Sequence, residues 1–122
     1  QIDVDVINDL VSIRMGGFFS AEDVLDFVAA RNAAHARLRC APNQHLTIND
    51  IREMKIQSQD TVAHFAQVLG APEHQSRKLA FVVCSSLARA QLTRALGGRD
   101  TQVFEDPDEA RAWLLSHRTR VI

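Results

Sequence analysis

The sequence predicts an α/β fold: a single domain with a mostly parallel β-sheet, an N-terminal β-hairpin and the element order ββαβαβαβα. Three observations support this prediction. Two alternating segments near the N-terminus flank a turn, a continuous apolar run covers residues 79–84, and a short strand leads directly into a capped helix within residues 101–114. The chain has 122 residues, of which 46% are hydrophobic and 24% charged, so it fits one globular domain over residues 1–122.

The hairpin is predicted from two segments in which apolar and polar residues alternate. Residues 2–6 alternate valine or isoleucine with aspartate, and residues 11–15 repeat this alternation after the turn dipeptide Asn8-Asp9. Two half-buried strands on either side of a short turn form a β-hairpin. The pair Gly16-Gly17 then ends the second strand.

The first helix is predicted to begin after Ser20, which can cap it, with Asp23 in the capping-box position. We expect the helix to continue to about Arg39. The apolar residues expected to face the sheet are Val24, Leu25, Phe27 and Val28. A third strand is expected over residues 45–49.

A second helix is predicted to start near Ser58 or Asp60 and to end before Gly70. Its apolar residues recur at helical spacing: Val62, Phe65, Ala66 and Leu69. The apolar strand at 79–84 follows, and Ser85-Ser86 can cap a third helix. The last strand, at 102–104, precedes a helix that Asp106 can cap and Pro107 can begin.

The charge and the cysteines exclude several classes of protein. The formal net charge is −1, which gives no reason to expect nucleic acid as a partner. No apolar run approaches the ~20 residues of a membrane span, and no signal peptide is recognisable. Two cysteines, Cys40 and Cys84, cannot form a disulfide framework, and we expect the Cys84 thiol to be buried at the end of its apolar run. We therefore expect a cytoplasmic protein.

The sequence contains no pattern typical of a catalytic or cofactor-binding protein. Its five histidines do not reach metal-ligand spacing with each other or with a cysteine. Four residues separate Cys84 from Arg89, whereas a phosphatase loop needs five residues and glycines. No phosphate-binding glycine loop or paired-carboxylate pattern is present either. We predict a non-enzymatic protein without a metal or cofactor.

The element order and the C-terminal pattern Val103-Phe104-Glu105-Asp106…Glu109-Ala110…Ala112-Trp113-Leu114 resemble the SpoIIAA-like family. These are small bacterial domains related in fold to STAS domains, which include anti-sigma-factor antagonists, and to the lipid-binding SEC14 domain. The resemblance covers nearly the whole chain. It implies a regulatory domain that binds a partner protein and has no catalytic residues.

In STAS domains a serine at the start of the second helix is phosphorylated by a partner kinase, where the phosphate meets the positive helix end. By resemblance, Asp50 matches the aspartate at the end of the third strand, and Ser58 matches that serine. Gln57 and Asp60 depart from the family pattern, and Asp60 would repel a phosphate. Ser58 is therefore interpreted either as a phosphorylation site or as a plain helix cap, and the cap is favoured.

The predicted working surface is the segment 50–60, the start of the second helix and the neighbouring turn after the strand at 79–84. Both turns follow parallel strands, whose carboxyl ends form the usual binding edge of an open α/β sheet. The candidate residues for partner binding or phosphorylation are Asp50, Gln57, Ser58, Asp60, Ser85 and Ser86. We expect a protein partner and leave a homodimer open.

The alternative function is the binding of a small apolar, lipid-like ligand, which kinship with SEC14 domains implies. The candidate residues of such a pocket are Phe18, Phe19, Phe65 and Phe81. Phe18 and Phe19 are adjacent after Gly16-Gly17, so both cannot point into the sheet. We expect one of them at an exposed patch or at the mouth of a pocket.

Overall fold

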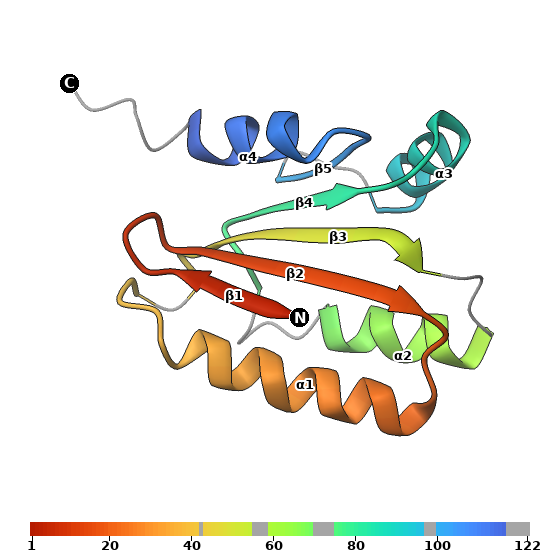
Figure 1. The fold of residues 1–122 in the computed structure, drawn as a ribbon, viewed down its shortest axis with the longest axis horizontal. Coiled ribbons are helices and arrows are strands. Elements are labelled where there is room, and N and C mark those ends of the chain that lie inside the picture. The colour runs from red at the N-terminus through yellow and green to blue at the C-terminus, as the bar shows by residue number, and fades with distance from the viewer. Residues whose placement is uncertain (42, 55–58, 70–74, 97–99, 117–122) are drawn as a thin grey trace.

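The computed structural model describes residues 1–41, 43–54, 59–69, 75–96 and 100–116 (Figure 1). The elements are β1 (Ile2–Asp5), β2 (Leu10–Gly17), α1 (Ala21–His35), β3 (Leu46–Met54), α2 (Gln59–Leu69), β4 (Lys78–Val82), α3 (Ser86–Leu96), β5 (Thr101–Phe104) and α4 (Pro107–Ser116). The predicted order of strands and helices is confirmed.

The five strands lie in the sheet in the same order as in the chain, β1-β2-β3-β4-β5. β1 pairs with β2 in antiparallel fashion, and every later neighbour is parallel. The predicted hairpin and the mostly parallel sheet are therefore both confirmed. The carboxyl ends of β2 to β5 share one side of the molecule, on the right in Figure 1. We call this side the carboxyl edge and take it to include residues 17–18, 52–54, 84–87 and 105–106.

Helices cover both faces of the sheet. α4 packs on one face, where Ala110 and Leu114 meet a fully buried group from the strands: Leu10, Leu46, Ala80 and Val82. On the other face, α1 covers Val11 and Ile13, and α3 lies against β5 (Figure 1). The core therefore has two apolar layers with the sheet between them. Burial of these layers is the main favourable term in folding.

The hairpin turn is longer than the predicted Asn8-Asp9 dipeptide. β1 ends at Asp5, and residues 6–9 form the turn before β2 starts at Leu10. The Asp5 carboxylate accepts hydrogen bonds from the backbone N–H groups of Ile7 (3.1 Å) and Asn8 (3.2 Å). Asp9 has a positive φ of 53°. These local bonds compete with strand pairing and stop β1 early.

The capping box of α1 is confirmed, but the end and one buried position of the helix differ from the prediction. The Asp23 N–H donates to the Ser20 hydroxyl (3.1 Å), and the Ser20 N–H donates to the Asp23 carboxylate (2.8 Å). The helix ends at His35 instead of Arg39, and beyond it Leu38 packs against the core. Leu25 is exposed, because the buried stripe is Val24, Phe27, Arg31 and Ala34.

β3 is longer than predicted and β4 is shorter. β3 continues to Met54, because β2 pairs with it as far as Gly17. Gly16 permits this pairing, since a Cβ there would lie 3.2 Å from the Cβ of Glu53. β4 ends at Val82, so Cys84 lies beyond the sheet and is exposed, not buried as expected.

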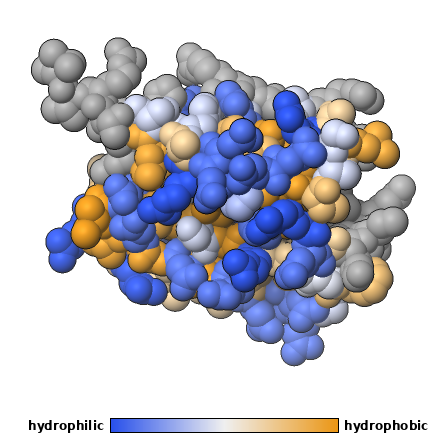
Figure 2. Space-filling model, turned by 45° about the horizontal axis from the view of Figure 1, so that its top comes forward, coloured by the Kyte–Doolittle hydropathy of each residue, from blue (hydrophilic) through white to orange (hydrophobic). Residues whose placement is uncertain are grey.

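The surface is mainly polar on the side that carries α4 and β5. Figure 2, which turns this side toward the viewer, shows hydrophilic residues over most of the described surface and hydrophobic residues chiefly at its margins. Among the described residues, no helix has the length and apolar character that crossing a membrane requires.

Candidate functional site

The residues predicted for partner binding that the structure describes lie toward the carboxyl edge, but in different surroundings. Asp50 belongs to β3, so the expected loop from 50 to 60 begins with five residues of strand. Asp60 is exposed in the first turn of α2. Gln57 and Ser58 lie outside the described residues, and their predicted roles are neither supported nor contradicted.

Asp50 is engaged with Arg52. Its carboxylate accepts hydrogen bonds from Nε of Arg52 at 3.0 Å and from Nη2 at 2.7 Å, and a third from the Arg52 backbone N–H at 3.1 Å. These bonds hold the pKa of Asp50 below its ordinary value. The Asp50 side chain is mostly buried, whereas that of Arg52 is partly exposed. Arg52, which the sequence analysis did not select, is therefore the member of this pair that a partner can contact.

Ser85 is the cap of α3. Its hydroxyl accepts a hydrogen bond from the Ala88 N–H at 3.1 Å, in agreement with the predicted capping function. Arg89, one turn into α3, forms an ion pair of 3.4 Å with Glu105 at the end of β5. Ser86 is exposed at the first position of the helix. The start of α3 and the end of β5 thus form one continuous part of the carboxyl edge.

Two large apolar side chains are exposed at the carboxyl edge. Phe18, directly after β2, is 73% exposed, and Leu87, in the first turn of α3, is 67% exposed. Phe19 is partly buried against the core, so one of the two adjacent aromatics is exposed and the other packs inward. The sequence analysis missed Leu87. Its position beside the capping serines, off the apolar stripe of its helix, is the signal that would have found it.

An open groove of about 570 Å³ lies between α1 and the strands β1 and β2. Phe18 and Phe19 line it at its carboxyl-edge end, and its apolar wall includes Met15, Phe27 and Ala30. Asp23, Asp26, Arg14 and Arg37 also line it and supply charge. A groove of this size and composition can hold an apolar chain with a charged end.

Of the phenylalanines predicted for an apolar pocket whose side chains the structure describes, Phe18 and Phe19 line this groove and Phe81 does not. Phe81 is buried with Val83 and Val103 over β4 and β5, two strands away from β2. The expectation that Phe81 lines the same pocket as Phe18 and Phe19 is therefore wrong. The Phe65 side chain lies outside the part of the chain that the structure describes.

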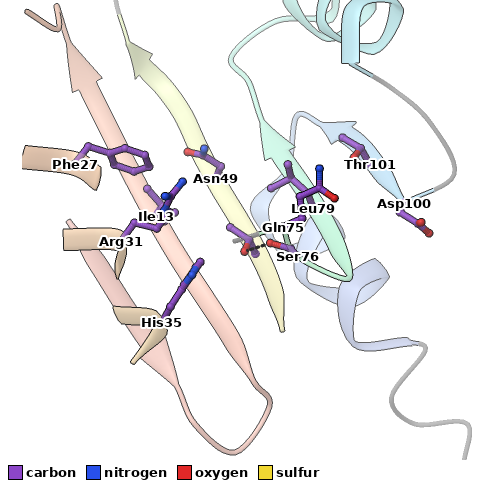
Figure 3. A pocket seen from close by; sticks show the side chains of 11 residues that line it. Ile13, Phe27, Arg31, His35, Asn49, Gln75, Ser76, Leu79, Asp100 and Thr101 are labelled. Carbon is purple, nitrogen blue, oxygen red and sulfur yellow. Dashed lines mark hydrogen bonds between the residues drawn. The ribbon is translucent and has the colours of Figure 1, made fainter. Parts of the chain in front are cut away.

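A second, more polar cavity of about 250 Å³ lies between α1 and the strands β3 and β4 (Figure 3). Its polar wall includes Arg31, Thr47, Asn49 and Ser76, from three separate segments of the chain. The sequence analysis did not anticipate it. No local spacing signals such a site, because its residues meet only after the sheet and α1 have packed.

Within the described residues, no three or more histidine, cysteine, aspartate or glutamate side chains are grouped so that they could hold a metal ion. Comparison of the chain with protein-family models, with curated proteins and with solved structures finds no match.

Proposed function

We propose that this chain is a non-enzymatic protein-interaction domain of the SpoIIAA-like kind, and that its partner binds at the carboxyl edge. The observation that carries the proposal is the exposure of Phe18 and Leu87 at this edge. Large apolar side chains among charged ones are typical of protein interfaces, where a few central residues supply most of the binding energy.

Charged groups beside these two side chains support the same proposal. Arg52 and Glu53 are exposed at the end of β3, and Glu105 and Asp106 are exposed at the end of β5. This mixture of both signs surrounds Leu87 and Phe18 with polar groups, as the rim of an interface surrounds its apolar centre. The order of elements, a hairpin followed by parallel βα units, agrees with what the resemblance implies for such a domain.

Regulation at Ser58 is a separate part of the proposal. In the chain, Ser58 immediately precedes α2, which begins at Gln59, and this is the position from which a serine caps a helix. A capping function needs no partner kinase. We therefore propose that partner binding at the carboxyl edge is independent of phosphorylation, and that Ser58→Ala retains it.

Site-specific photocrosslinking tests the proposed interface. A photoreactive phenylalanine analogue is placed at position 18, 87 or 25 in cells that produce the protein. Leu25 is the matched control, since it is apolar and exposed but lies on α1. We expect one discrete adduct from positions 18 and 87 and none from position 25. Equal labelling from all three positions, or no adduct from 18 and 87, would contradict the proposal.

The groove beside α1 favours a second candidate function, the binding of an apolar chain with a charged end. The probe is palmitate, and its binding is measured by the displacement of a fluorescent fatty-acid analogue. Ala30→Phe should fill the groove and abolish displacement, whereas Ala29→Phe, exposed on α1 but outside the groove lining, should leave it unchanged. Identical behaviour of the two variants, or no binding by the unmodified protein, would exclude this function.

A further inference from the structure

Buried polar side chains are concentrated at one place on the α1 face of the sheet. The buried polar or charged residues within the described segments are Arg31, His45, Thr47, Asn49 and Thr61. Three of them, Arg31, Thr47 and Asn49, line the polar cavity, and His45 lies next to it. Burying polar groups in a small domain opposes folding unless they are paired or used. These side chains are concentrated around one cavity, so pairing or a function must offset the cost of burying them.

One side of the cavity is a chain of hydrogen-bonding groups from neighbouring strands. The hydroxyls of Thr47 and Ser76 are hydrogen-bonded to each other, as the dashed line in Figure 3 marks. Ser76 also shares a hydrogen bond of 3.2 Å with Nε2 of His45. The His45 ring in turn lies against that of His35, with 4.3 Å between the ring centroids. This network organises the wall at the amino ends of β3 and β4.

Asn49 is the exception within this wall. Its side chain is only 2% exposed, and its Oδ1 atom is buried without a hydrogen-bond partner. Figure 3 shows it extending from β3 toward the side of α1, where Phe27 and Arg31 lie. A buried amide oxygen without a donor is unfavourable. A bound molecule that carries a donor would remove that penalty.

Arg31 supplies the positive charge of the cavity and is held in place. Its Nη1 donates to the carbonyl of Val68 at 2.8 Å, and its Nε and Nη2 donate to Oδ1 of Asn32 at 3.4 Å and 3.3 Å. A buried guanidinium positioned in this way is suited to oxygen acceptors such as a carboxylate. Asp100 also lines the cavity but is exposed, lies on the side away from Arg31 in Figure 3 and contacts Lys78 at 3.5 Å.

The geometry points to a binding site for a small hydroxy- or amino-carboxylic acid in this cavity. The hydroxyl or amino group of the ligand donates a hydrogen bond to Oδ1 of Asn49, and its carboxylate lies toward Arg31. Ile13, Phe27 and Leu79 provide an apolar wall for the carbon skeleton. A volume of about 250 Å³ is smaller than the pockets that hold drug-sized molecules, so the ligand is a small one.

Titration of the isotope-labelled full chain tests the site. The probes are serine, glutamate, malate and lactate, each added to millimolar concentration and followed through the backbone and side-chain amide signals. At least one probe should shift the Asn49 side-chain signal in a saturable manner. Signals of the carboxyl edge should not move, which separates this result from the proposed partner binding. If all four probes leave Asn49 unshifted, or shift only surface residues, the site is refuted.

Variants at Asn49 and Thr61 give the matched comparison. Asn49→Leu removes the unpartnered oxygen at similar size, so it should weaken probe binding by about tenfold or more. It should also raise the melting temperature of the ligand-free protein. Thr61→Val changes a buried polar residue outside the cavity lining and should retain probe binding. A lower melting temperature in Asn49→Leu with unchanged probe binding would overturn the proposal.

A crystal structure of the unmodified protein soaked with the bound probe decides between a ligand and solvent without relying on a variant. Polar cavities of this kind can hold ordered water. Probe density that contacts both Asn49 and Arg31 is the expected result. Density for ordered water alone would show that solvent satisfies Asn49, and the proposed site would be wrong.

Discussion

Ser20 and Asp23 stabilise the start of α1 through reciprocal hydrogen bonds, each accepting from the backbone N–H of the other. Ser20→Ala removes one of these bonds and should lower the free energy of unfolding by about 1 kcal/mol. Urea denaturation measures the change. Ser86→Ala, an exposed serine at the first position of α3, is the control and should change stability much less.

Asp23 also makes the stability of the protein dependent on pH. Hydrogen bonds from the backbone and hydroxyl of Ser20 lower the pKa of Asp23 below its ordinary value of 3.8. The stabilisation is complete above that ordinary value, and it is lost as the pH falls through the lower pKa of the folded state. Asp23→Asn should therefore show a smaller loss of stability between about pH 5 and pH 2. Parallel urea-midpoint profiles for the two proteins would contradict this assignment.

Asp9 occupies the left-handed region of the backbone map, with a φ of 53°. β-Branched residues are unfavourable there, so Asp9→Val should lower the free energy of unfolding by about 1–2 kcal/mol. Asp9→Gly fits the same conformation and should retain most of the stability. Thermal melts of the two variants provide the comparison, and equal losses would show that the backbone conformation at Asp9 is not the cause.

At the scale of elements, α4 contributes through the side chains that it buries. Leu114 is fully buried against β2, β3 and β4, so Leu114→Ala should lower the free energy of unfolding by about 3 kcal/mol. Leu87→Ala is a matched control, since this leucine is largely exposed and its truncation should change stability by about 0.5 kcal/mol or less. Comparable losses in chemical denaturation would mean that α4 is not anchored as the structure indicates.

The kinds of element could be predicted from the sequence, because hydrophobic periodicity and capping residues are local signals. Ser20, Ser85 and Asp106 each cap the helix that they were expected to cap. Strand boundaries that depend on pairing with another strand were missed. β3 extends to Met54 because β2 pairs alongside it, and Cys84 lies beyond the sheet because the pairing of β4 with β5 ends at Val82.

The candidate sites were less predictable than the elements. Parallel topology placed Asp50 and Ser85 near one edge, but the pairing of Asp50 with Arg52 changed which residue faces a partner. The polar cavity was missed altogether. Asn49 and Arg31 are 18 positions apart and belong to a strand and a helix, so only tertiary packing brings them to the same hollow.

At the scale of the whole molecule, the proposed interface lies beyond the carboxyl ends of the parallel strands, whereas the polar cavity lies on the α1 face and takes its strand lining mainly from the amino-terminal parts of β3, β4 and β5. Substitutions at distant sites without shared contacts usually act independently. Phe18→Ala combined with Leu87→Ala should therefore weaken partner binding and leave probe binding at Asn49 unchanged. Asn49→Leu should have the opposite pattern. Measuring partner binding and probe binding in both variants tests this independence. A loss of both kinds of binding in either variant would show that the two sites are coupled.

The agreement between strand order and chain order has a consequence for biosynthesis. Each strand pairs with the one made just before it, so the sheet can grow at one edge as the ribosome extends the chain. The face that carries Leu10, Leu46 and Val82 receives its helix only when α4 is complete. Until then the nascent chain exposes this apolar face to solvent, so a chaperone would matter most in the interval before α4 has been made.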